Sequence, residues 1–269
     1  MLRITSALQN VSTNTVVYTN CYPRSCNVGG VALDEFSIAI DSTRSPTDAR
    51  EFRRDLEKYF QLPIEYLFLT HRHTDHRNGI PAFQDLTIVS RAKTSELMPK
   101  TVKWDKLNTL TFKDELVING IDNEVKVELY RLGGHTAGSS ILYFPNEKVV
   151  FAGDLVIEFV PVVAGMEKTF NPDEWIKALE FIKSLDVEKI VPGHSWFNKA
   201  HYAKSDLDQH TEVLIAFRSQ VVGAIKNKID LIDLDVPQSE FLDFLEAQIP
   251  TLPIKHQKRV IKQIESTKQ

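Results

Sequence analysis

The sequence predicts an α/β protein with a helical C-terminal extension, and three observations support this expectation. Over the first 200 residues, short apolar or alternating stretches take turns with amphipathic ones, as strands and helices do. Polar residues suited to chemistry directly follow several of the apolar stretches. From about residue 206 onward, apolar residues recur only at helical spacing. We therefore expect one domain over residues 1–205 and a helical extension over residues 206–269.

The first elements are three short strands, one helix and one buried strand. β-branched or alternating stretches bounded by turn residues predict strands over 14–20, 29–33 and 36–42. A helix follows over 45–60, with Ser45 as N-cap, Pro46 in the first turn, and Phe52, Leu56 and Tyr59 on one face. The apolar run 64–71 predicts a strand buried on both faces.

Later elements continue the alternation. Three further strands are expected, and their ranges are 86–90, 115–118 and 125–134. Segments 139–145 and 148–154 fit a hairpin that turns at the sequence PNEK. A helix over 171–185 has Asn171 as N-cap and Pro172 at its first position, and a short buried strand covers 188–194. Three amphipathic helices are then expected within 206–229, 237–249 and 252–266.

Composition narrows the class of protein. The 32 Lys and Arg against 36 Asp and Glu give a formal charge of −4, which provides no general attraction to nucleic acid or to an anionic membrane. The polar N-terminus lacks the apolar run of a signal peptide, and no segment reaches membrane-spanning length. Cys21 and Cys26 do not make a disulfide framework. We expect a cytoplasmic protein with no membrane and no nucleic-acid partner.

Histidines and aspartates gather where predicted strands end. Three histidines and one aspartate fall within the segment THRHTDHRNG. Two further histidines and one aspartate are the last residues of the segments GGH, AGD and PGH, which end later predicted strands. The seven candidate ligands are His71, His73, Asp75, His76, His135, Asp154 and His194. A single tetrahedral zinc needs only about three protein ligands and a water. Seven therefore predict two metals that share a bridging carboxylate, with zinc expected and iron or manganese as alternatives.

These motifs resemble those of the metallo-β-lactamase superfamily. THRHTDH matches its H-x-H-x-D-H motif, GGHTAGSS its G-H-T-x-G-S motif, and FAGDLV and VPGH its later Gly-Asp and Gly-His motifs, in the expected order. IAIDS matches the family's early strand that ends in aspartate, here Asp41. The resemblance spans about residues 13 to 200 and implies an αββα sandwich with the metals at one edge of the two sheets.

The resemblance also assigns roles to the candidate ligands. It implies that His71, His73 and His135 hold a first metal, that Asp75, His76 and His194 hold a second, and that Asp154 bridges them. Asp41 is implied to orient a metal ligand by hydrogen bonding, with a turn aspartate as the alternative interpretation.

Two positions depart from the family pattern. Asn78 stands where glycine is common, and asparagine tolerates the left-handed conformation that a turn there would need. Asp154 stands where one group of true β-lactamases has cysteine, which points to the broader hydrolase family.

The functional hypothesis is a binuclear metallohydrolase. A metal pair would supply hydroxide to attack a small carbonyl compound such as a thioester, lactone, ester or lactam, with Asp75 orienting the nucleophile. Two alternatives stay open: an iron-dependent oxidoreductase or dioxygenase on the same fold, and a phosphodiesterase or nuclease. Ser139 and Ser140 are interpreted as turn and strand residues rather than nucleophiles.

Three further features carry open hypotheses. The Cys21–Cys26 loop can overhang the site, where the thiols either contact substrate or are inert. Trp196, Phe197 and Tyr202 either line a substrate pocket or pack against the C-terminal helices. Since two-fold dimers are the commonest closed oligomers, a homodimer is expected.

Overall fold

A computed structural model describes residues 8–19, 25–157, 169, 171–195, 199–212 and 214–215. The chain divides into two units between Leu214 and Ile215, and both sheets belong to the first unit. The strands are β1 Leu8–Ser12, β2 Thr15–Tyr18, β3 Val28–Ala32, β4 Ser37–Ile40, β5 Ile64–Leu69, β6 Thr87–Arg91, β7 Thr109–Phe112, β8 Glu115–Asn119, β9 Lys126–Arg131, β10 Ser140–Phe144, β11 Val149–Ile157 and β12 Lys189–His194. The helices are α1 Pro46–Phe60, α2 Thr74–Arg77, α3 Ala92–Glu96 and α4 Pro172–Ser184, with short 3-10 turns η1 Ile80–Ala82, η2 Lys100–Val102, η3 Trp104–Lys106 and η4 Pro145–Glu147.

The strands form two mixed sheets. The first has the order β1-β2-β3-β4-β5-β6-β7, antiparallel from β1 to β4 and parallel from β4 to β7. The second has the order β12-β11-β10-β9-β8, with β11 and β12 parallel and the other pairs antiparallel. Each parallel pair is joined through a segment that contains a helix or a long loop, as parallel pairing requires.

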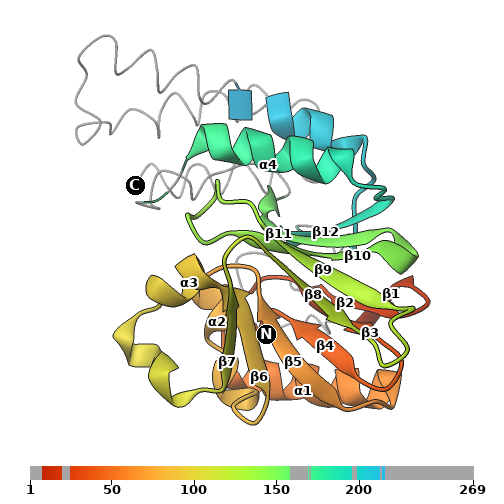
Figure 1. Cartoon of the computed structure of the whole chain (residues 1–269), viewed down its shortest axis with the longest axis vertical. Coiled ribbons are helices and arrows are strands. Elements are labelled where there is room, and N and C mark those ends of the chain that lie inside the picture. Colours follow the sequence, from red (N-terminus) through yellow and green to blue (C-terminus); the bar gives the residue numbers. More distant parts are fainter. Residues whose placement is uncertain are drawn as a thin grey trace, which may run out of the picture. The chain divides into compact units, whose positions relative to one another are not determined.

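Three apolar clusters define the layers. One joins the two sheets and includes Phe68 of the first sheet and Phe144 of the second. Another places Phe52 and Leu56 of α1 against the first sheet. In the third, Trp175 and neighbouring residues of α4 cover the second sheet. The order is helices, sheet, sheet, helices, as Figure 1 shows, and the expected αββα sandwich is confirmed.

Local signals set the expected helix starts and the hairpin. The Ser45 side chain accepts a hydrogen bond from the amide of Asp48, and Asn171 caps α4 by accepting from the amides of Asp173 and Glu174. β10 and β11 pair antiparallel around η4, which confirms the hairpin that turns at PNEK. The expected starts of α1 and α4 are thus confirmed.

Two details of the expected burial are wrong. Tyr59 is 40% exposed, with its hydroxyl donating to Asn10 Oδ1 at 2.7 Å, and the buried side of α1 is made by Ala49, Phe52 and Leu56. β5 is fully buried over its last three residues, but Glu65 is exposed. The spacing of apolar residues predicts which face of a helix or strand points towards the core. How many residues along that face are buried depends on the neighbouring layer.

The extension from residue 206 lies mostly outside the described residues. Residues 206–212 are helical, while the segments 237–249 and 252–266 are not described. The boundary after Ser205 and the homodimer stay predictions. Tyr202 is buried with Leu207 in the apolar cluster that includes α4, which favours a packing role for Tyr202 over a place in a substrate pocket. Trp196 and Phe197 lie outside the described residues. None of the described helices combines the length and apolar character needed to cross a membrane.

Candidate metal centre

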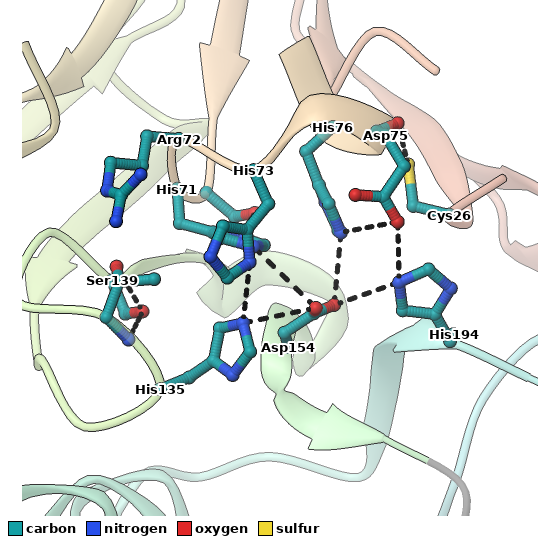
Figure 2. Close-up of polar contacts among 12 residues, drawn as sticks. Cys26, His71, Arg72, His73, Asp75, His76, His135, Ser139, Asp154 and His194 are labelled. Atoms are coloured by element: carbon teal, nitrogen blue, oxygen red, sulfur yellow. Dashed lines mark hydrogen bonds and ion pairs between the residues drawn. The ribbon is translucent and has the colours of Figure 1, made fainter. Parts of the chain in front are cut away.

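All seven candidate ligands lie together at one edge of the sandwich. His71 and His73 follow β5 of the first sheet, and α2 then carries Asp75 and His76. The second sheet supplies the rest, because His135 follows β9, Asp154 lies in β11 and His194 ends β12. Figure 2 shows the side chains converging on Asp154 from both sheets.

The first group consists of His71, His73, His135 and Asp154, whose ligand atoms lie within 4.8 Å of one another. His135 Nε2 is 3.0 Å from His73 Nδ1 and 3.3 Å from Asp154 Oδ2. His71 Nε2 is 3.6 Å from the same carboxylate oxygen. Three imidazole nitrogens and one carboxylate oxygen therefore point at a common centre, the donor set that divalent zinc or iron accepts.

The second group consists of Asp75, His76 and His194. His194 Nε2 is 3.1 Å from Asp75 Oδ2, and His76 Nε2 is 3.9 Å from that oxygen. The other carboxylate oxygen of Asp154, Oδ1, is 3.1 Å from His76 Nε2 and 3.5 Å from His194 Nε2. Asp154 thus faces the first group with Oδ2 and the second group with Oδ1.

A backbone irregularity brings Asp154 into the centre. The sequence placed Asp154 at the end of a strand, but β11 continues to Ile157, so that expectation is wrong. The pairing of β11 with β12 shifts register on either side of Gly153, which has φ +51°. A side chain at Gly153 would meet Thr70 at 2.7 Å. Glycine here allows the bulge that turns Asp154 towards the histidines.

A buried aspartate connects the two groups from behind. Asp41 Oδ2 accepts hydrogen bonds from Thr70 Oγ1 and from His76 Nδ1, both at 2.8 Å, and Oδ1 accepts from the Thr70 amide at 2.9 Å. Since the Thr70 hydroxyl donates to Asp41, its oxygen accepts from His71 Nδ1 at 3.0 Å. Nδ1 therefore keeps its hydrogen in both rings, which leaves Nε2 of His71 and of His76 to face the centre.

The two groups differ in their charge. Burial lowers the pKa of His71 well below its ordinary value, with the neighbouring charge of His76 adding to the effect. Burial likewise lowers the pKa of His135 to about 4. Both rings are consequently neutral at pH 7, the form that binds metals.

The second group holds its charge differently. Burial opposes charge on His194, but the nearby carboxylates of Asp154 and Asp75 raise its pKa to about 9. Burial would raise the pKa of Asp75, yet the charge of His76 and a hydrogen bond from His194 hold it below the usual range. In the metal-free protein, the second group is therefore a cluster of carboxylates and protonated imidazoles.

Within the described part of the chain, several ligand atoms of the two groups lack a hydrogen-bond partner, which a metal ion would replace. Nε2 of His71, Nε2 of His76 and Oδ1 of Asp154 are buried, and none forms a well-directed hydrogen bond with another described residue. Buried polar atoms are normally satisfied, so three converging ones indicate a missing partner. A pair of divalent cations, one for each group, would satisfy all of them.

The turn after the ligands forms without left-handed geometry. Asn78 has φ −67° and ψ −15°, so the tolerance that asparagine offers is not used there. Gly79 is the residue that the turn needs, because a Cβ at this position would lie 1.6 Å from the Ser42 carbonyl oxygen. Ser139 accepts from the Thr136 amide and Ser140 lies in β10, as expected for turn and strand residues.

Several residues that contact the ligands carry no local signal in the sequence. Asn27 bonds to the chain on both sides of His194, and the Trp175 ring packs on His135 at 5.3 Å. Cys26 is fully buried beside Asp75 and His76, and burial raises the pKa of its thiol to about 11. Cys21 lies outside the described residues.

The chain matches the family model described as the metallo-beta-lactamase superfamily over residues 21–194. The chain belongs to this superfamily. A metallo-beta-lactamase from Pontibacter korlensis has the same fold, with a TM-score of 0.64 and 20% identity over 78% of this chain and 98% of that one. Superfamily membership and the His/Asp cluster together imply a divalent metal.

Curated relatives in the superfamily carry different activities in their names. The 2,4-dinitroanisole O-demethylase subunit alpha of Nocardioides sp. is 26% identical over 72% of this chain and 58% of its own length. A hydroxyacylglutathione hydrolase of Bartonella quintana is 24% identical over 71% of this chain and 72% of its own. A metallo-beta-lactamase type 2 of Bacillus sp. is 27% identical over 58% and 62%. The chain spans 58% of the length of the first of these relatives.

Proposed function

We propose that the protein is a binuclear metal-dependent hydrolase of a small carbonyl compound, with zinc as the metal. The observation that carries this proposal is the Asp154 carboxylate, which presents Oδ2 to His71 and His135 and Oδ1 to His76 and His194. A carboxylate between two such groups is the arrangement of a two-metal site. When bound, a metal pair lowers the pKa of water towards neutrality and polarises the oxygen under attack.

The chain's own residues would orient the reactants. The Asp75 side chain is 27% exposed, whereas those of Asp154 and Asp41 are 5% and 2% exposed. Asp75 is thus the carboxylate best placed to contact both an attacking water and the solvent. Because its pKa lies below the usual range, it stays ionised and can accept a hydrogen bond from that water. We therefore assign Asp75 to orienting the nucleophile.

Two relatives support a carbonyl substrate by name, the hydroxyacylglutathione hydrolase and the metallo-beta-lactamase. The O-demethylase relative adds an aryl methyl ether to the compounds worth testing. The net charge of −4 argues against a nuclease, which needs several cations along the phosphate chain. We further propose that the protein is cytoplasmic and forms a homodimer.

The test combines metal analysis with a substrate panel. Protein stripped by a chelator and reloaded with Zn²⁺ is assayed on a thioester, a lactone, an ester, a lactam, an aryl methyl ether and a phosphodiester. We expect two zinc ions per chain and zinc-dependent hydrolysis of at least one carbonyl compound. Cleavage of the phosphodiester alone would favour the nuclease alternative. Activity that appears only with iron and consumes oxygen would favour the oxidoreductase.

A further inference from the structure

The residue before β3, Asn27, binds the end of β12 on both sides of His194. Its amide N–H donates to the Gly193 carbonyl at 2.7 Å. Its side-chain Nδ2 donates to the Pro192 carbonyl at 3.0 Å and lies 3.2 Å from Ser195 Oγ, which in turn donates to Asn27 Oδ1 at 3.3 Å. Asn27 is only 4% exposed. A side chain from the first sheet therefore fixes the strand end that carries a ligand of the second group.

These bonds occur where the pairing of β12 with β11 is irregular. The ladder between β11 and β12 is regular from Val149 to Phe151 and then shifts register before and after Gly153. Pro192, the partner of Gly153, has no amide hydrogen to donate. The ladder resumes at the pair Ile157–His194, so Asn27 adds contacts from outside the second sheet where the pairing is interrupted.

The preceding residue reaches the other half of the same group. The thiol of Cys26 donates to the main-chain carbonyl of Asp75 at 3.0 Å, and Cys26 is completely buried. Figure 2 shows this thiol next to the main chain of Asp75, on the side away from Asp154. Asp75 comes from the first sheet and His194 from the second, and their side chains approach to 3.1 Å.

We propose that Cys26 and Asn27 form a brace that sets the separation of Asp75 and His194, and so controls the affinity of the second metal selectively. Both are treated as positioning residues, since their hydrogen bonds run to the chain beside the ligands, from Cys26 to the Asp75 carbonyl and from Asn27 to residues 192–195. The inference rests on the two-metal site of the proposed function. The bonds of the brace run to Asp75 and to the chain around His194, both of the second group, so we expect the first metal to bind independently.

The experiment measures stepwise zinc affinities by competition with a chromophoric chelator, together with metal content and thermal unfolding. Asn27→Leu removes the side-chain bonds at similar volume, and Asn27→Asp keeps the acceptor but removes the donor to Pro192. In both variants we expect the second zinc to bind about 10- to 100-fold more weakly, as for other residues that orient ligands, and the first zinc to bind as in the unmodified protein. Cys26→Ala weakens the second zinc in the same way, whereas Cys26→Ser, which keeps a donor, restores it.

Ser37→Ala is the matched control. Ser37 is also fully buried and donates to a proline carbonyl, that of Pro63, but it lies at the far end of β4 from the ligands. It should lower the unfolding temperature and leave both zinc affinities unchanged.

The outcomes separate the two proposals. If the unmodified protein binds two zinc ions and folded Asn27 variants bind both equally well, the brace is refuted and the two-metal site stands. Equal weakening of both metals also refutes the brace, because it indicates a general loss of stability. If the unmodified protein binds a single zinc ion, the proposed two-metal function fails first and the brace with it.

Discussion

Replacing Asp41 by asparagine tests whether one buried carboxylate orients ligands in both groups. Asp41 has φ +58°, a conformation that asparagine adopts more readily than most residues, so the backbone should survive the change. The carboxylate accepts three hydrogen bonds, from the Thr70 amide, the Thr70 hydroxyl and His76 Nδ1. An amide has one acceptor oxygen and one donor nitrogen in the same space.

Neither orientation of the asparagine satisfies all three donors. With its nitrogen at the position of Oδ2, it faces His76 Nδ1, which must then give up its hydrogen and leave Nε2 protonated towards the centre. With its nitrogen at Oδ1, it opposes the Thr70 amide. One unsatisfied buried donor costs about 1–3 kcal/mol. We expect metal affinity to fall about 10- to 100-fold, as for other residues that orient metal ligands, with the second metal affected most.

The assay is the same chelator competition, with thermal unfolding of the metal-free protein measured in parallel. Asp114→Asn is the control, because Asp114 pairs with Arg131 on the surface, where the side chains are 78% and 50% exposed. This control should change neither metal affinity. An Asp41→Asn protein that binds both metals with unchanged affinity would refute the orienting role.

The remaining predictions concern the ligands, protons and packing. His135→Ala should weaken the first zinc and His194→Ala the second, as metal titration of each variant will show; the reverse pattern would contradict the grouping. Because the pKa of His194 is about 9 and that of His135 about 4, the second zinc must displace a proton below pH 9 and the first need not. The affinity for the second zinc should therefore fall as the pH drops from 9 to 6. Calorimetry in buffers of different ionisation enthalpy measures the protons released on binding, and a proton release that stays constant with pH would contradict this prediction. Gly79→Ala should destabilise the protein by about 1–3 kcal/mol or more, since its Cβ would overlap the Ser42 carbonyl; an unchanged unfolding temperature would contradict this packing.

The alternation of strands and helices and the set of clustered ligands leave local signals in the sequence, and the sandwich was implied by the resemblance of those motifs to a known superfamily. Histidine and aspartate next to glycine at the ends of apolar runs are visible without a structure. The caps Ser45 and Asn171 act within three residues of themselves, so their effect was also predictable. Their roles as ligands stay a prediction that metal analysis will test.

Other features depend on partners far away in sequence. Asn27 contacts Pro192 and Ser195 across more than 160 residues, and nothing near Asn27 indicates this. No local pattern in the sequence predicted β1, β7 or the short helices α2 and α3. The continuation of β11 past Asp154 depends on a register shift against β12, which is a property of the pair of strands rather than of either one.

The division of each group between the sheets has a consequence for stability. His71 and His73 come from the first sheet while His135 and Asp154 come from the second, and Asp75 and His76 likewise face His194 across the sandwich. A metal in either group would therefore tie the sheets together and bind only when they are packed. Ligands that bind only the folded state stabilise it by about 2.7 kcal/mol at 100 times their dissociation constant. The loop behind the centre is strained, because Asp41 and Thr43 both have positive φ. The ligand segment supports this loop, since Ser42 donates two hydrogen bonds to the His76 carbonyl. Ligand placement and sheet packing are thus coupled, and a loss at one is expected to weaken the other.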